Sequence, residues 1–314
     1  MPPRAACQPG GMSLLGQLSQ LPGSYQGPDF AATDRSGAAP YGLLGLGEAS
    51  LAARLCEDFA QATLVRMGTQ LVLSSPETQA AADDFAALAE VSGVNVVRVG
   101  AGQGGRFNLN TLSYLAPGGV LSTYHLAQYV AHATGHGQEA LQAEALLSAL
   151  RDQCAPEVQE GNPARELAWS LWGRAPLLLA PAGEGALIQA WQTLLARVGK
   201  VLSVPVEQQP LYTLTGAFEA HHERGDGRLA LILGEEDAEM AMCREILETR
   251  IDEVALVSYP QGSQGYAGAL ALWYYGAWVA AYLAEREGAI PEDSAALTQL
   301  MASLVSGVPD DELN

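Results

Sequence analysis

Residues 39–59 read APYGLLGLGEASLAARLCEDF, and residues 175–195 read APLLLAPAGEGALIQAWQTLL. The shared residues recur at a constant offset of 136 positions (176 − 40): Pro40 and Pro176, Gly47-Glu48 and Gly183-Glu184, Leu51 and Leu187. Each copy has a short apolar run, then a glycine-containing turn, then a helical pattern, which is how a βαβ unit begins. The repeat therefore predicts that the chain is duplicated.

The elements that follow each copy also occur in the same order. The expected elements are a strand at 70–73, a helix at 76–91 and a strand at 94–99 in the first half, and a strand at 228–233, a helix at 235–250 and a strand at 254–258 in the second. Alternating strands and helices of this length indicate a parallel sheet with helices on both faces. We therefore predict an α/β protein with two tandem doubly wound, flavodoxin-like subdomains.

Helical patterns at 138–153 and 163–172 lie between the two halves, separated by the turn-rich stretch Gly161-Asn162-Pro163. We expect a tail at 1–11, a first subdomain with bridging helices at 12–155, and a second subdomain with C-terminal helices at 156–314. A final amphipathic helix is predicted at 294–305.

The composition and net charge exclude several classes of function. The 314 residues are 48% hydrophobic and 16% charged, which is typical of a globular protein, and the net charge of −19 argues against binding to nucleic acid or anionic membranes. Lys200 is the only lysine. The four cysteines are widely spaced, so neither a zinc site nor a disulfide framework is indicated and a cytoplasmic location is expected.

One uncharged stretch, QGYAGALALWYYGAWVAAYLA at 264–284, is long enough to cross a bilayer. No other segment resembles it and flanking positive charge is nearly absent. We favour a buried core or interface helix over a membrane span.

Two loops carry the residue types of an anion site. They lie at 45–50 and 74–78, at the expected carboxyl ends of adjacent parallel strands, where open α/β sheets bind ligands. Ser50, Ser74, Ser75 and Thr78 offer hydroxyls beside helix N-termini, which suits a phosphate. Helix capping alone is the competing interpretation of these residues.

Two further patterns are less specific. Gly100 to Gly105 match GxGxxG after a predicted strand, but no long helix pattern and no acidic residue at the expected distance follow, so a turn is favoured over a dinucleotide site. His221-His222-Glu223 lie in a polar loop, where an imidazole could move a proton, although a plain surface pair explains them equally well. The remaining histidines, His125, His132 and His136, are interpreted as structural or solvated.

The tandem halves, the glycine loop at 45–50, the histidine loop at 221–223 and the C-terminal pattern together resemble the sugar isomerase (SIS) fold. More narrowly, they resemble the bifunctional phosphoglucose/phosphomannose isomerases. The GMGGSA-like loop of that family corresponds to LGLGEAS at 44–50, and its SxSGxT phosphate cradle to LSSPET at 73–78. The resemblance implies a phosphate site formed by Gly47, Ser50, Ser74, Ser75 and Thr78.

The resemblance also assigns catalytic positions. The RWKTQxNENAK helix matches at Trp191, Thr193 and Lys200, while the glutamate that serves as base falls on Arg197. The ELNHNE segment matches at Glu219 and His222, which implies that His222 opens the sugar ring. The PRxA arginine falls near Ser122 or Thr123, and the lysine of the terminal LK pair near Met301.

Because the base and the oxyanion-holding arginine are replaced, other residues must supply that chemistry if the chain is an enzyme. Glu184 or Glu48 could serve as base, and Arg197 or Lys200 could hold the oxyanion. We expect an aldose–ketose isomerase that interconverts glucose 6-phosphate or mannose 6-phosphate with fructose 6-phosphate through a cis-enediol. No metal or cofactor is implied, and a homodimer is expected because the histidine loop completes the neighbouring site in this family.

Two other functions remain open. One is a catalytically decayed sugar-phosphate sensor that keeps the phosphate cradle. The other is a nucleotide-dependent enzyme that uses Gly100 to Gly105, which a binding assay with nucleotides would test.

Overall fold

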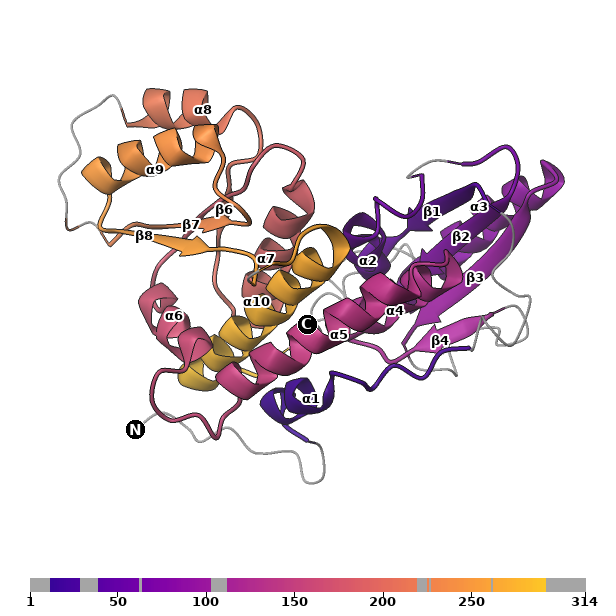
Figure 1. Cartoon of the computed structure of the whole chain (residues 1–314), viewed down its shortest axis with the longest axis horizontal. Helices are drawn as coiled ribbons and strands as arrows, with labels where there is room; N and C mark the ends of the chain where they lie inside the picture. Colours follow the sequence, from indigo (N-terminus) through magenta and orange to yellow (C-terminus); the bar gives the residue numbers. More distant parts are fainter. Residues whose placement is uncertain are drawn as a thin grey trace, which may run out of the picture.

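The computed structural model describes residues 12–28, 39–61, 64–102, 112–218, 225, 227–260 and 262–291. It contains two parallel four-stranded sheets at opposite ends of the molecule, with helices between and around them (Figure 1). The predicted tail at 1–11 and the predicted helix at 294–305 lie outside the described residues.

The first sheet has the strand order β1-β2-β3-β4. Its strands are β1 (Tyr41–Gly45), β2 (Thr69–Ser74), β3 (Asn95–Ala101) and β4 (Tyr114–Ala116). All six residues of β2 are buried, as expected for a central strand covered on both faces. The 3₁₀ turns η1 (Gly47–Ala49) and η2 (Pro76–Thr78) follow β1 and β2 and lead into the helices α2 (Ser50–Leu55) and α3 (Gln79–Val91).

The second sheet has the order β6-β5-β7-β8. Its strands are β5 (Leu177–Leu179), β6 (Val204–Pro205), β7 (Leu229–Leu233) and β8 (Glu253–Val257). The helices α8 (Pro210–Ala217) and α9 (Ala238–Arg250) pack on one face, and α7 (Gly185–Arg197) lies on the other (Figure 1). The predicted α/β fold with two parallel sheets is therefore confirmed.

The middle of the molecule is helical. Its helices are α1 (Leu14–Gln20), α4 (Ser122–Ala133), α5 (Gly137–Cys154), α6 (Pro163–Leu171) and α10 (Gly265–Glu287). Helix α10 contacts α5, α6 and α7, and Trp273, Tyr274 and Trp278 on it are fully buried. One continuous apolar core therefore joins the two halves.

Among the described helices, only α10 is long and apolar enough to cross a membrane. In its most apolar stretch of 18 residues, 89% of the residues are buried inside the protein. The core helix of a globular protein can have the same length and composition. Its burial agrees with the interpretation of this stretch as a core helix.

Candidate functional site

The loops after β1 and β2 meet at the carboxyl edge of the first sheet. Gly47 has a φ of +59°, a left-handed conformation that favours glycine. A Cβ atom on it would lie 2.7 Å from Thr78 Cγ2 and 2.8 Å from Ser75 Oγ. Both the backbone conformation and the close approach of the loops therefore require glycine here.

The second loop is held by its own hydroxyls. Ser75 is the N-cap of η2 and forms a capping box with Thr78, whose hydroxyl accepts from the Ser75 backbone N–H at 3.1 Å. The Thr78 hydroxyl also lies 3.3 Å from the carbonyl oxygen of Leu46, in the first loop, and 3.2 Å from that of Ser75, so these two acceptors share its one hydrogen. The Ser75 hydroxyl donates to the carboxylate of Glu77. Thr78 thus ties the two loops together, and Ser75 is engaged by an acid.

The other two predicted phosphate residues lie close by. Ser74 is the last residue of β2 and is buried, whereas Ser50 begins α2 with its Cα 2.8 Å from the position of a Cβ on Gly45. Ser50 also lines a hollow of about 230 Å³. The structure therefore brings Gly47, Ser75 and Thr78 into one cluster, with Ser74 next to Ser75 in the chain, whereas Ser50 lines a hollow that none of the three cluster residues lines.

An ion pair joins the first loop to the second half of the chain. Arg197, at the last position of α7, forms an ion pair with Glu48, with its Nη1 atom 2.7 Å from Glu48 Oε1. The two side chains are 26% and 30% exposed, so the pair is only partly screened by water. A second contact runs alongside, because Arg54 in α2 donates to Gln189 Oε1 in α7 at 2.6 Å. An acid and a cation therefore meet next to Gly47.

Comparisons with known proteins identify the family of the chain. Residues 14–135 match the phosphoglucose isomerase N-terminal domain, and residues 160–304 match the bacterial phospho-glucose isomerase C-terminal SIS domain. A glucose-6-phosphate isomerase-like protein from Thermus thermophilus is 31% identical, with coverage of 92% of this chain and 94% of that one and a TM-score of 0.77. The chain belongs to the bacterial phosphoglucose isomerase family.

More distant solved structures share the SIS fold. Glucosamine-6-phosphate deaminase from Thermotoga maritima is 10% identical, with coverage of 89% of this chain and 94% of that one and a TM-score of 0.56. Tagatose-6-phosphate ketose/aldose isomerase from Escherichia coli is 9% identical, with coverage of 80% and 83% and a TM-score of 0.52. At these identities the likeness concerns the fold alone. No curated protein matches the sequence.

Several residues that the family pattern marks as catalytic are placed by the structure. Arg197 stands at the family's glutamate position and contacts Glu48. Ser122 and Thr123, near the family's arginine position, are buried at the start of α4. His222 and Met301 lie outside the described residues.

Glu184 and Lys200 lie elsewhere. Glu184, in the glycine turn before α7, accepts a hydrogen bond from the Tyr259 hydroxyl at 2.7 Å. Burial, together with this bond, raises the pKa of Tyr259, so the hydroxyl keeps its proton at neutral pH. Lys200 is exposed beyond the end of α7, with a φ of 56°. The catalytic roles of both residues stay predictions.

The other histidines have packing roles. His125 is buried, and desolvation lowers its pKa to about 4, so it is neutral at physiological pH. His132 stacks on Tyr25, and His136 stacks on Phe59 with ring centroids 4.1 Å apart. Gly100 and Ala101 are the last residues of β3, and Gly102 follows the strand. Residues 103–105 of the glycine-rich pattern lie outside the described residues.

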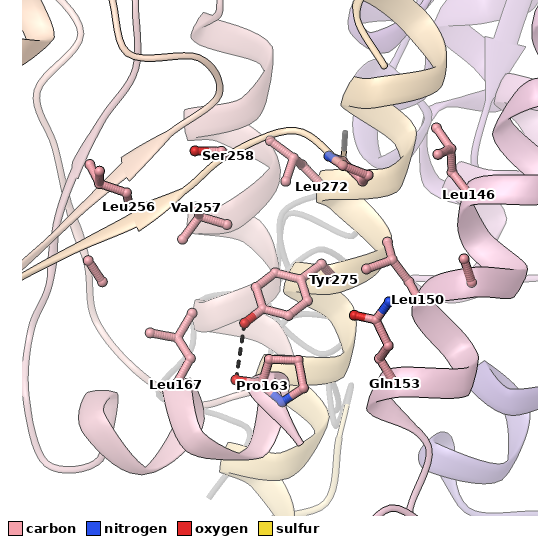
Figure 2. A pocket seen from close by; sticks show the side chains of 13 residues that line it. Leu146, Leu150, Gln153, Pro163, Leu167, Leu256, Val257, Ser258, Leu272 and Tyr275 are labelled. Atoms are coloured by element: carbon pink, nitrogen blue, oxygen red, sulfur yellow. Dashed lines mark hydrogen bonds between the residues drawn. The ribbon is translucent and has the colours of Figure 1, made fainter. Parts of the chain in front are cut away.

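A larger cavity of about 470 Å³ lies between α5, α6, α10 and β8 (Figure 2). Its lining is mostly aliphatic, with Leu150, Leu167 and Leu272 pointing into it, and the Tyr275 hydroxyl donates to the Pro163 carbonyl oxygen at 3.1 Å. No charged residue lines it among the described residues. The cavity therefore does not suit a sugar phosphate.

Sequence reasoning missed Glu77. Its place between Ser75 and Thr78 in the LSSPET stretch was visible, but only the structure shows its carboxylate turned back onto the Ser75 hydroxyl. The contact between Glu48 and Arg197 was also beyond the sequence, because the two residues are far apart in the chain.

Proposed function

We propose that this member of the sugar-phosphate isomerase family interconverts glucose 6-phosphate or mannose 6-phosphate with fructose 6-phosphate through a cis-enediol. Ser75 and Thr78, with Gly47, Ser50 and Ser74 around them, would hold the phosphate. Family membership supports the substrate class. The loop supports the phosphate position, because hydroxyls and helix N-terminal amides are suitable phosphate donors.

The observation that carries the proposal is the pair Glu48–Arg197. In the resemblance, the catalytic glutamate falls on position 197, where this chain has arginine; that arginine contacts Glu48, which lies in the stretch that corresponds to the glycine loop of the family. A carboxylate is therefore still present where the first loop meets α7, but it lies on the loop instead of on the helix. Its neighbour Gly47 touches Ser75 and Thr78, so the acid lies beside the proposed phosphate loop.

These residues would perform the reaction as follows. The Glu48 carboxylate removes the proton from C2 of the open-chain aldose, and the electron pair forms the C1–C2 double bond of the enediolate. Arg197 stabilises the negative charge on the enediolate oxygen. Glu48 returns the proton to C1, and a proton moves from O2 to O1, which gives the ketose. From the sequence alone, we assign ring opening to His222.

A substitution series tests these roles. Glu48→Gln is expected to lower kcat by about a hundredfold or more while leaving sugar-phosphate affinity nearly unchanged, because a general base acts on the reaction rather than on binding. Ser75→Ala is expected to weaken binding instead. Glu166→Gln, an exposed change on α6, is the matched control. Unchanged turnover in Glu48→Gln would remove Glu48 from the mechanism.

The contacts that Arg197 and Ser75 already make favour a second candidate function, a sugar-phosphate sensor. Arg197 is paired with Glu48, and the Ser75 hydroxyl is hydrogen-bonded to Glu77, so both are already engaged in the structure. A sugar-phosphate sensor without turnover would show this arrangement if the two pairs are permanent. Binding without conversion in the wild-type protein distinguishes it from the isomerase.

A further inference from the structure

The Glu77 carboxylate lies next to the hydroxyl and glycine of the proposed phosphate loop. Its carboxylate accepts the hydrogen bond of the Ser75 hydroxyl. Its Oε1 atom also lies 3.3 Å from the position of a Cβ on Gly47, on the same side as Ser75 Oγ and Thr78 Cγ2. The carboxylate therefore lies between the first and second loops, next to Gly47 and bonded to the Ser75 hydroxyl.

The position of the Glu77 carboxylate affects how the loop can bind a phosphate. A serine hydroxyl has one hydrogen to donate, so the Ser75 hydroxyl cannot donate to a phosphate while it donates to Glu77. Two anions at contact distance also repel each other, and Arg197 is already paired with Glu48. A phosphate must therefore displace Glu77 before it can use the loop.

We propose that Glu77 is an internal competitor that occupies the phosphate position and lowers the affinity of the loop for phosphorylated ligands. The inference rests on the proposed phosphate site and adds a specificity residue to it. Glu77 is exposed and lies on a short turn, so its side chain can swing away without unfolding the loop. The capping box between Ser75 and Thr78 would remain after the swing, since Glu77 is not a member of it.

The test is Glu77→Gln in the full chain, which keeps the shape of the side chain and removes its charge. Binding of inorganic phosphate and of fructose 6-phosphate is measured by titration calorimetry at low ionic strength. We expect affinity for both to rise about tenfold, because the repulsion between two charges in contact is removed. Asp84→Asn, an exposed change further along α3, removes one charge away from the loop and is expected to alter affinity less than about twofold.

The outcomes separate this inference from the proposed function. Equal affinity in wild type and Glu77→Gln would overturn the role of Glu77 and leave the phosphate site standing. Absence of binding in both proteins would overturn both. Tighter binding of phosphate in Glu77→Gln that is lost in the double variant Glu77→Gln/Ser75→Ala would support the role of Glu77 as a competitor. If the proteins bind fructose 6-phosphate but do not convert it, only the isomerase proposal would fail.

Discussion

Gly47 and Gly183 are equivalent positions of the repeat, yet their surroundings differ. Both have positive φ, at +59° and +93°. A Cβ on Gly47 would collide with Ser75 and Thr78, whereas a Cβ on Gly183 would meet no atom within 4 Å. Substitutions at the two glycines can therefore distinguish the free-energy cost of a left-handed backbone from the cost of a steric clash between the two loops.

Alanine at each glycine measures this difference. Gly183→Ala is expected to lower the free energy of unfolding by about 1 kcal/mol, the cost of a left-handed non-glycine residue. Gly47→Ala carries the same cost and also pushes the two loops apart, so it should lose more stability and its phosphate binding. Urea unfolding and phosphate titration of both variants check this. Equal effects of the two substitutions would contradict the role of the close loop contact.

The sequence predicts single site residues where a motif fixes them. Gly47, Ser75 and Thr78 could be placed because glycine turns and capping residues have local signatures. Glu77 and the pairing of Glu48 with Arg197 could not, because those contacts depend on side-chain orientation and on the packing of α2 against α7.

At the scale of elements, α10 shows how packing outweighs propensity. Gly276 in this helix faces Trp191, and a Cβ there would lie 2.9 Å from the indole Cε2 and 3.1 Å from Leu194 Cδ1. Trp191 is itself fully buried, so it has no space to retreat. The glycine therefore allows α7 and α10 to approach.

A pair of helix substitutions tests that statement. Gly216→Ala on α8, where a Cβ meets nothing within 4 Å, is expected to raise the free energy of unfolding by up to about 1 kcal/mol through helix propensity. Gly276→Ala should lower it by about 1–3 kcal/mol, because overpacking exceeds the gain in propensity. Thermal or urea unfolding of the two variants decides. A stabilised Gly276→Ala protein would show that α7 and α10 are not tightly packed at this point.

The long periodic elements were predictable from the sequence, and so were the apolar runs of the repeat, whereas β4 and β6 were not. The helices at 137–154 and 238–250 and the strands β2 and β7 lie within three residues of the expected bounds. Strand β6 has two residues and β4 has three, too few for an alternation to be visible. Pairing with a neighbouring strand, rather than local sequence, creates these two.

At the scale of the whole molecule, the two halves are joined by α10 and by the contacts between α2 and α7. Arg54–Gln189 and Glu48–Arg197 cross the same junction, and the proposed reaction uses the second of them. The duplication that the sequence shows thus places a candidate site where the halves meet. The domain boundary between 155 and 156 stays a prediction.

We propose that the protein assembles as a homodimer, which stays a prediction from the resemblance. We expect sedimentation velocity at micromolar concentration to give a species of twice the 32.9 kDa chain mass. If the His222 loop completes the neighbouring site, His222→Ala is expected to lose turnover while the dimer persists. A monomer at these concentrations that still turns over would contradict the shared site.

The most direct test of the central claim is proton NMR of fructose 6-phosphate with catalytic amounts of the protein in deuterated buffer, with saturation transfer recorded on the same sample. The account predicts new aldose signals and deuterium at the exchanging carbon, because Glu48 moves a proton between C1 and C2. Saturation transfer without conversion or deuterium uptake would contradict the isomerase and favour the sensor. Silence in both experiments would contradict the sugar-phosphate site itself.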